Sequence, residues 1–594
     1  MILRAGRNEG AGLAWAAVAL AFAAYLWIFL PLIPADGRGL GADYSLHLPN
    51  LLAGYFLYLQ NGLLAVPWFN PGQCGGVPFI ADLNVGYYSL PQFLAFVVDP
   101  LIAVRATFVV FAAIGALGFY ALARRAFALS PAASAVAAVL FLFNGTFAYR
   151  MAIGHLTFHP LMLAPWIALC LIRGTTLGAL LAGALFAYAF QAGMIHGIGP
   201  VAFAVAIVIL IHGIRSGQSA RPWIAFAGAA VVAVALSATR LAAALALAKN
   251  FPRNEYALPG FPNLFAALRV AFLSLIDLTP VAEAWQSLAN TDIFLDRPEW
   301  EYAVGPIAAL LIVAGAAVLV ARRGRVRRHA PAVVAIAAIL ALPLLLNWYV
   351  PAWNALLKHV PLLGSSTTLV RWFMLYVPVA VFAAALAFDT LFPRALRAPA
   401  MALAVLAIVA PNALVEKGTY RAQRYDATPI VAAWHGGQAI PVTDIVVDPQ
   451  STPERRVRLG GNNAIAAGQS QLYCYAPVFG YQLEALPIGD LHAGPISDLS
   501  SDGALNLKNP SCYLFPGANS CRPGDAFSVE QAGAADSFVH YEQFPFGLPP
   551  LQVAANWLNL LALVGFVLAV PILMVRNRSR GAPFRGLDAM PPAR

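Results

Sequence analysis

The segment Gly39-Leu-Gly-Ala-Asp43-Tyr-Ser-Leu-His47 comes shortly after the first long apolar stretch of the chain. That stretch ends near Leu32 and is long enough to cross the hydrocarbon core of a membrane, which is about 30 Å thick. Asp43 therefore falls where the chain leaves the membrane. A carboxylate in such a place is costly unless it is solvated or has a function, so Asp43 is the leading candidate for a catalytic base.

The composition of the whole chain is that of an integral membrane protein. Of its 594 residues, 60% are hydrophobic and 11% are charged, whereas a soluble domain carries roughly 25% charged residues. The formal net charge of +10 does not indicate nucleic-acid binding, because the arginines cluster at the ends of apolar runs, where they set the orientation of membrane helices. Five cysteines without a CxxC motif disfavour a thiolate metal site.

Twelve apolar runs predict twelve transmembrane helices. They cover approximately residues 11–32, 96–122, 131–149, 156–172, 177–193, 198–214, 222–247, 303–321, 330–347, 371–391, 399–415 and 553–575. The first run is too long for a signal peptide and lacks a clean cleavage site, so it is expected to stay as a helix. With the N-terminus in the cytoplasm, the basic clusters fall on the cytoplasmic side, as the positive-inside rule requires, and Arg322–Arg328 is the strongest of them.

Three regions follow from this pattern. Residues 1–415 are expected to form an α-helical polytopic membrane domain with a large first external loop at 34–95. Residues 416–550 are richer in charge, glycine and asparagine, and alternating stretches such as 440–447 predict short strands. This region is therefore expected to be a mixed α/β or β-rich periplasmic domain. Residues 551–594 hold the last transmembrane helix and a basic cytoplasmic tail.

Two local features stand out in the polar regions. Residues 49–60 have the pattern of an amphipathic helix lying at the membrane interface. Cys512 and Cys521 enclose a Pro/Gly/Asn turn, which predicts a hairpin disulfide in an oxidising compartment. The alternatives are two free thiols or pairing with Cys474, and Cys74 and Cys474 otherwise read as separate cysteines.

Charged and polar residues gather at the external ends of the predicted helices, where an acid and a base could divide the work of a transferase. Asp43 would deprotonate an acceptor hydroxyl, and Asp82, in a Gly/Pro/aromatic loop, is the second catalytic candidate. Arginine or lysine would hold a phosphate leaving group. The substrate-binding candidates are His47, Arg150, His155, His159, Arg240, Lys249 and Arg371. Glu299 and Glu301 belong to the same external set without an assigned role.

Each candidate also has a structural interpretation. Asp43 could cap a helix, and Arg240, inside an apolar run, could extend to the outer interface. His155 and His159 have the i, i+4 spacing of a metal site on one helix face, but no glutamate follows His155. Phosphate or hydroxyl binding is therefore favoured. No cofactor is expected, and a divalent metal stays open as an alternative that the pattern does not favour. Arg371 could bind phosphate or anchor the helix at the interface.

The layout resembles that of the GT-C membrane glycosyltransferases, which have one span, a large first external loop with an early Asp, many further spans and a C-terminal periplasmic domain. Three sets of segments resemble the bacterial YfhO-like branch: Trp68-Phe-Asn-Pro-Gly-Gln-Cys-Gly-Gly-Val-Pro-Phe79, Asn144-Gly-Thr-Phe with Gly154-His155-Leu, and Arg371-Trp-Phe. The similarity in layout extends to about residue 400.

The resemblance implies an inverting glycosyltransferase in the bacterial inner membrane. Its partners would be a polyprenyl-phosphate sugar donor, membrane lipids and an external glycan, glycolipid or protein acceptor. Asp43 matches the first-loop catalytic Asp by position. The acidic doublet frequent in the superfamily is missing, because Ala42 and Tyr44 flank Asp43, and this favours a metal-free mechanism.

Two other classes of protein stay open. A lipid or polysaccharide transporter would show polar residues along several helix interiors, and one built from inverted repeats would show internal symmetry. A non-catalytic envelope assembly protein would make Asp43 and Arg240 individually dispensable. The sequence contains no Walker A motif, which disfavours ATP-driven transport.

Overall fold

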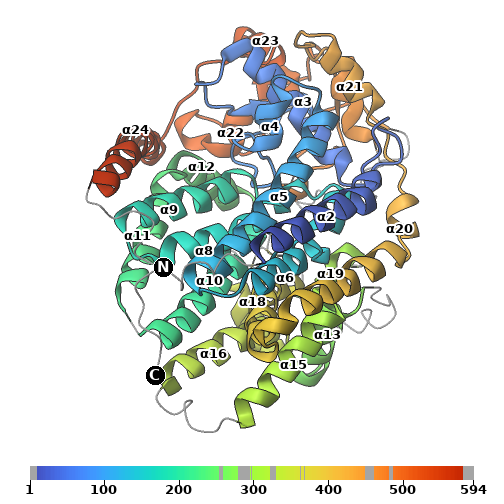
Figure 1. Ribbon diagram of the computed structural model, residues 1–594. Coiled ribbons are helices and arrows are strands. Elements are labelled where there is room, and N and C mark those ends of the chain that lie inside the picture. Colours follow the sequence, from blue (N-terminus) through green and yellow to red (C-terminus); the bar gives the residue numbers. More distant parts are fainter. Residues whose placement is uncertain are drawn as a thin grey trace.

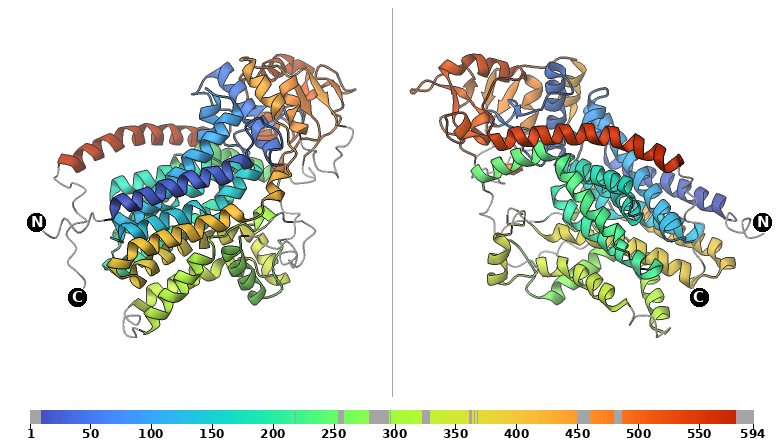
Figure 2. Two further views of the ribbon diagram at one scale, coloured as in Figure 1. Left: turned by 45° about the vertical axis from the view of Figure 1, so that its right-hand side comes forward. Right: turned by 90° about the vertical axis from the view of Figure 1, so that its left-hand side faces the viewer.

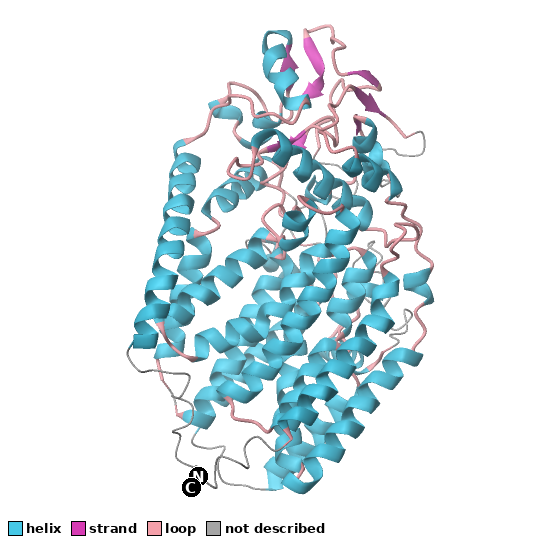
Figure 3. Cartoon of the chain, turned by 45° about the horizontal axis from the view of Figure 1, so that its top comes forward, coloured by secondary structure: helices cyan, strands magenta, loops and turns pink. Residues whose placement is uncertain are grey.

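The computed structural model describes most of the chain. The described residues are 10–217, 219–252, 258–278, 295, 297–321, 329–360, 363–364, 366, 368–448, 460–479 and 486–579. They form a bundle of long helices with a cap at one end, and the strands gather in the cap (Figure 3). The cluster Arg322–Arg328 and the basic tail after residue 579 lie outside the described residues.

The described residues hold seven helical segments that are long and apolar enough to cross a membrane. These are α2 with η1 (Ala11–Phe29, Leu30–Leu32), α5 (Pro100–Ala126), α6 with α7 (Pro131–Leu142, Gly145–Ile153), α10 (Ile195–Ser216), η5 with α18 (Val370–Leu375, Tyr376–Leu391), η6 with α19 (Arg394–Leu396, Arg397–Leu414) and α24 (Pro550–Ser579). An eighth is a broken pair, α11 (Arg221–Ala235) and α12 (Ala238–Asn250), bent by 70°. The chain is therefore a multi-pass membrane protein.

Four more of the predicted spans are shorter apolar helices. They are η2 with α8 (Leu156–Leu163, Ala164–Ile172), α9 (Thr176–Gln191), α15 (Pro306–Ala321) and α16 (Ala330–Leu346). All twelve apolar runs are helical, but the predicted count of twelve spans is not confirmed. The physical reason is length: a helix rises about 1.5 Å per residue, so 16 residues reach about 24 Å, short of a core of about 30 Å. Two further helices, α13 (Leu264–Ile276) and α17 (Pro351–Lys358), lie between the predicted apolar runs.

Both views of Figure 2 show the cap at one end of the long helices, and Figure 1 shows α6 among these helices. Helix α6 contacts α2, α5, α18 and α19. Its sequence is rich in alanine, and small side chains let helices approach closely in lipid. The apolar window of the span that α6 forms with α7 is fully buried. The end of α7 is thereby held firmly at the boundary between the bundle and the cap.

The cap is built from two segments that are far apart in the sequence, drawn blue and orange to red in Figure 1. The first contributes α3 (Tyr44–Asn61), β1 (Phe69–Asn70), β2 (Val77–Pro78) and α4 (Leu90–Ala95). The second contributes α20 (Gly418–Arg421), α21 (Thr428–His435), β3 (Asp444–Val446), η7 (Gly461–Ala467), β4 (Gln469–Gln471), β5 (Gly494–Pro495), β6 (Ala504–Lys508), α22 (Pro510–Leu514), β7 (Ala526–Ser528) and α23 (Ala532–Val539).

The strands form three small sheets, ordered β1-β2, β4-β3-β5 and β6-β7. In the central sheet β3 pairs with β4 in parallel, with Asp444 opposite Gln469, and with β5 antiparallel. Strand β3 lies within the alternating stretch 440–447, so the predicted strand there is confirmed.

The two cap segments are joined by a disulfide and by backbone hydrogen bonds. Cys74 and Cys474 form a disulfide, although the sequence presents them as separate cysteines. The Lys508 N–H donates to the Gly75 carbonyl at 2.8 Å. A second disulfide joins Cys512 and Cys521, as their spacing predicts. The first loop and the C-terminal region thus fold together as one cap.

The helix predicted at residues 49–60 is present, but its start and its surroundings differ from the prediction. Helix α3 begins earlier, at Tyr44, and every residue from Tyr44 to Leu57 is buried. It packs against α4, η7 and α21. The physical reason is the second cap segment, which covers the faces of α3 that the local pattern leaves to solvent or lipid.

Candidate active site

Asp43 is held where the end of α7 meets the start of α3. The Asp43 N–H donates to the Ile153 carbonyl at 3.0 Å. Gly154 ends α7 with φ 105°, and a Cβ on it would lie 2.3 Å from the Tyr44 nitrogen. Only glycine combines that backbone conformation with so close an approach. The Gly154-His155 sequence therefore brings the residues after α7 directly against Asp43.

Both oxygens of the Asp43 carboxylate have a partner. His155 Nε2 contacts Oδ2, and the Tyr475 hydroxyl donates to Oδ1 at 2.9 Å. The Asp43 and His155 side chains are 19% and 16% exposed, so the pair is sheltered but can be reached from solvent. Tyr475 comes from the second cap segment, 432 residues away in the sequence.

Arg150 fixes the tautomer of His155. Its Nη1 lies 3.1 Å from His155 Nδ1, and an arginine can only donate hydrogen bonds. Nδ1 is then the acceptor, and the ring proton on Nε2 is the one donated to Asp43. In this arrangement His155 orients the carboxylate.

Glu299 joins Arg150 to Arg371. Arg150 Nη2 lies 3.1 Å from Glu299 Oε2, while Arg371 Nε and Nη2 both bond the same carboxylate, the former at 3.0 Å to Oε2. The Arg150 guanidinium also lies over the Phe158 ring, 4.3 Å from its centroid. Arg150 is fully buried, whereas the Arg371 side chain is 15% exposed.

The electrostatics keep both carboxylates ionised. Burial raises the pKa of Asp43, but contact with His155, the neighbouring His47 and the Tyr475 hydrogen bond bring it below its ordinary value. Burial also raises the pKa of Glu299, but Arg150 and Arg371 hold it well below the usual range. Burial lowers the pKa of His47 to about 4, so His47 is neutral at pH 7. The site therefore holds an ionised Asp43 beside a neutral His47 and the hydrogen-bond donor His155.

Four predicted site residues thus come together around Asp43: His47, Arg150, His155 and Arg371. The expected shared helix face of His155 and His159 is wrong. Residues 156–163 form a 3₁₀ helix with Pro160 inside it, which changes the i, i+4 geometry. His159 instead bonds the Tyr188 hydroxyl at 2.7 Å.

Arg240 belongs to a different contact set. Its guanidinium donates to four backbone carbonyls, those of Asp82, Val85, Phe190 and Gln191. The Asp82 carboxylate accepts from the Asn84 N–H at 2.7 Å. Asp82 and Arg240 therefore lie together at a loop that is tied to the end of α9. Lys249 is exposed in the last turn of α12.

Two residues of the site have no assigned role in the sequence analysis. Glu299 is one of several external acids, and nothing local singles it out as the link between Arg150 and Arg371. Tyr475 lies in the second cap segment, and no local pattern connects it to Asp43. Within the described ranges, no group of three or more His, Cys, Asp or Glu side chains could hold a metal ion.

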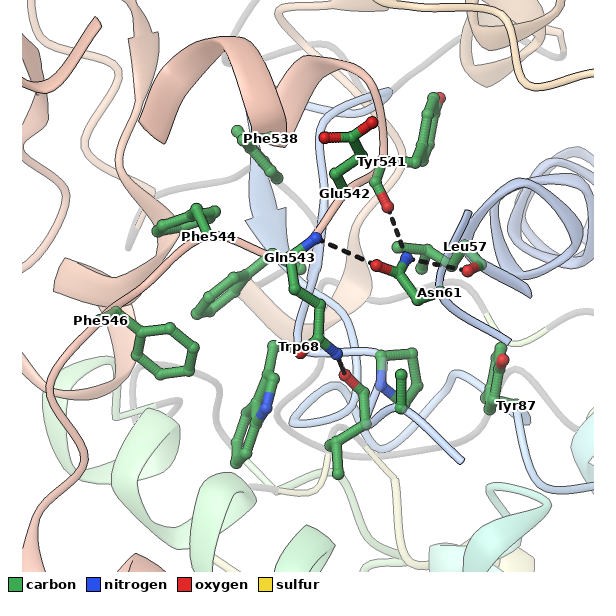
Figure 4. A pocket seen from close by; sticks show the side chains of 14 residues that line it. Leu57, Asn61, Trp68, Tyr87, Phe538, Tyr541, Glu542, Gln543, Phe544 and Phe546 are labelled. Carbon is green, nitrogen blue, oxygen red and sulfur yellow. Dashed lines mark hydrogen bonds between the residues drawn. The ribbon is translucent and has the colours of Figure 1, made fainter. Parts of the chain in front are cut away.

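Two small cavities lie along α3. One, of about 20 Å³, is lined by His47, Asn50 and His159 among others, and it is large enough for one water. The Asn50 Nδ2 has no hydrogen-bond partner there. The other lies at the far end of the helix, beside Asn61 (Figure 4). An 18-residue helix is about 27 Å long, so that second cavity is remote from Asp43.

Figure 4 shows the remote cavity as an aromatic pocket closed by amide hydrogen bonds. Trp68, Phe544 and Phe546 line one side. Asn61 Nδ2 donates to the Tyr541 carbonyl at 2.7 Å and the Gln543 N–H donates to Asn61 Oδ1 at 3.1 Å. These contacts join the two cap segments and belong to the packing of the cap.

No protein-family model and no curated protein matches the chain. Two solved structures are similar to it, both of the arabinofuranosyltransferase AftD from mycobacteria, the second a mutant. The first has 16% sequence identity and a TM-score of 0.42, over 74% of this chain and 29% of that chain. The second has 15% identity and the same TM-score of 0.42, over 76% and 31%. The chain thus spans less than a third of AftD, and a likeness at this TM-score carries no argument about fold or function.

Proposed function

We propose that the protein is a membrane glycosyltransferase of the GT-C type, which moves a sugar from a polyprenyl-phosphate donor to a hydroxyl of an external acceptor. The observation that supports this proposal best is the Asp43 carboxylate itself. It is ionised, oriented by His155 and placed beside the Arg150, Glu299 and Arg371 cluster where the bundle meets the cap. This combination suits a general base next to a site for an anionic leaving group.

In the proposed reaction Asp43 takes the proton of the acceptor hydroxyl. The acceptor oxygen forms a bond to the anomeric carbon of the sugar, and the bond from that carbon to the phosphate oxygen breaks. The polyprenyl phosphate leaves as an anion. Because the displacement is direct, the anomeric centre is inverted. Asp82, predicted as a second acid, lies in the Arg240 contact set, and its catalytic role stays a prediction.

Arg371 is the proposed contact for the donor phosphate. Arg150 and Arg371 carry two positive charges, and Glu299 carries one negative charge. The cluster therefore has a net charge of one positive unit, which favours an anion. Arg371 is partly exposed, whereas Arg150 is fully buried. Arg150 would therefore act through its neighbours, and Arg371 would touch the phosphate. The predicted phosphate role of Arg240 would require it to leave its carbonyl partners.

The proposed location is the bacterial inner membrane with the cap in the periplasm. The cap carries two disulfides, and disulfides persist in oxidising compartments. On that side the acceptor would be a glycan, a glycolipid or a protein. The donor lipid would reach Asp43 from the outer leaflet.

The test is sugar transfer in proteoliposomes with labelled polyprenyl-phosphate sugars and a mixed envelope extract as acceptor. We expect Asp43→Asn to lower the transfer rate by about 100- to 10,000-fold, the contribution of a general base. Asp82→Asn, measured in the same assay, tests the second catalytic candidate. Normal transfer by a folded Asp43→Asn protein would remove Asp43 from the mechanism. Movement of intact donor across the membrane without transfer would favour a transporter.

A further inference from the structure

The partner of Asp43 Oδ1 is a hydroxyl group that does not come from a substrate. Tyr475 Oη donates to this oxygen at 2.9 Å, while Oδ2 is held by His155. A general base meets its substrate hydroxyl at the same kind of distance, about 2.6–3.2 Å. The phenol thus occupies a position that an attacking hydroxyl would need.

Taking the proposed function as its basis, we propose that Tyr475 holds the acceptor position of Asp43 closed until an acceptor hydroxyl replaces its phenol. Tyr475 is then a specificity-determining residue that selects a bound acceptor over water. The ligand class at this position is an alcohol of an acceptor large enough to contact the cap.

The backbone of Tyr475 is fixed. Asn462 Oδ1 accepts from the Tyr475 N–H at 2.9 Å, and Asn462 Nδ2 donates to its carbonyl at 3.1 Å. The preceding residue, Cys474, is fully buried and joined to Cys74. These contacts hold the main chain of the cap in place over Asp43.

The side chain of Tyr475 is partly buried, whereas Cys474 before it is fully buried. In the proposal an acceptor that contacts the cap replaces the phenol at Oδ1 while the Asn462 contacts hold the main chain. Water has only its own hydrogen bonds with which to displace the phenol, whereas an acceptor adds its contacts with the cap.

The chemistry shows why such a residue matters. If water takes the place of the phenol, Asp43 accepts a proton from it, and the water oxygen bonds to the anomeric carbon as the phosphate leaves. The products are free sugar and polyprenyl phosphate, so the donor is consumed without transfer. The hydrogen bond from the Tyr475 hydroxyl to Oδ1 suppresses this hydrolysis.

Tyr475→Phe is the direct test, because it removes the hydroxyl and keeps the ring. We expect the ratio of free sugar to transferred sugar to rise about tenfold, the effect of losing one hydrogen bond to a charged group. The acid limb of the transfer rate should also move to higher pH, because Asp43 loses a donor that lowers its pKa. His47 and His155, the other titratable groups facing Asp43, are unchanged in the variant. Tyr473→Phe, two residues away, is the matched control.

A second measurement does not depend on turnover. Peptide-resolved carbodiimide labelling reads the accessibility of the Asp43 carboxyl in the purified full chain. We expect labelling of Asp43 to be several-fold faster in Tyr475→Phe and unchanged in Tyr473→Phe.

The outcomes separate the two proposals. Transfer by the wild type with an unchanged product ratio in Tyr475→Phe would overturn the role of Tyr475 and leave the glycosyltransferase proposal standing. Unchanged Asp43 labelling would overturn it as well. Faster labelling in a protein that neither transfers nor hydrolyses any donor would overturn the glycosyltransferase proposal, and the acceptor role of Tyr475 with it.

Discussion

Two buried arginines, Arg150 and Arg240, are 0% and 1% exposed, yet they have different kinds of partner. Arg240 donates to four backbone carbonyls. Arg150 meets the side chains of His155 and Glu299. A guanidinium bonded to carbonyls fixes where the chain runs. A guanidinium bonded to titratable side chains fixes where protons sit, so partner type separates a structural arginine from a chemical one better than burial does.

The strongest test of this comparison is Arg240→Met. The substitution leaves four carbonyls without donors, and each buried unpaired group costs about 1–3 kcal/mol. We expect a loss of stability of at least about 4 kcal/mol, seen as a large fall in Tm or a failure to fold in detergent. Lys249→Met, on the exposed side of the same helix, is the control. A normal Tm for Arg240→Met would break the comparison.

Arg150→Lys should lower activity while the protein stays folded. Lysine can still pair with Glu299, but it lacks the fork that reaches both Glu299 and His155. Without that fork His155 loses the donor at Nδ1 that orients its ring, and Asp43 loses the partner that holds its carboxylate in place. We expect transfer to fall about 10- to 100-fold, toward the lower end of a general-base contribution.

The pH profile of Arg150→Lys distinguishes this mechanism from simple damage. In the wild type Asp43 has a pKa below its ordinary value of 3.8, so transfer should not decline until the pH falls below about 4. In the variant the decline should begin at a higher pH, because a displaced His155 lowers the pKa of Asp43 less. An acid limb that stays at the wild-type position would show that Arg150 does not hold His155 against Asp43.

A smaller effect is expected from Glu301→Gln. This variant tests whether the Glu301 carboxyl makes the stability of the protein depend on pH. Burial raises the pKa of Glu301 to about 7, although Arg297 and Tyr420 oppose the shift. A raised pKa gives stability that is present below the unfolded value of about 4.3 and lost as pH rises through about 7.

The wild type should therefore lose about 2 kcal/mol between pH 5 and pH 8 through this group. Glu301→Gln should flatten that dependence. Thermal unfolding of both proteins at the two pH values measures the difference. A wild-type Tm that is equal at both would contradict the buried, proton-binding state of Glu301.

Local features of the site could be predicted from the sequence. Asp43 follows a long apolar run, and Arg150 and His155 lie in a very short link between two such runs. Both signals depend on neighbouring residues alone. The structure brings these three together through the close approach of Gly154 to Tyr44.

Long-range features could not be predicted in the same way. The Tyr475 contact and the Cys74–Cys474 disulfide cross 432 and 400 residues, and no local pattern carries such pairings. For Arg240 the sequence shows a buried charge without showing its partners. The pairing of His155 with His159 fails because an α-helical spacing is assumed where Pro160 lies in a 3₁₀ helix. For the fold, the helices follow from apolar runs, but the number that cross the membrane depends on helix length and bending.

The disulfide between Cys74 and Cys474 also sets an order for biosynthesis. Cys74 is made first and must wait for a partner 400 residues later, about 20–80 s at ordinary translation rates of 5–20 residues per second. Throughout that time its thiol is free to pair with other cysteines, and Asp43 lies uncovered because Tyr475 follows Cys474 directly. The cap therefore cannot mature until most of the membrane helices have been made.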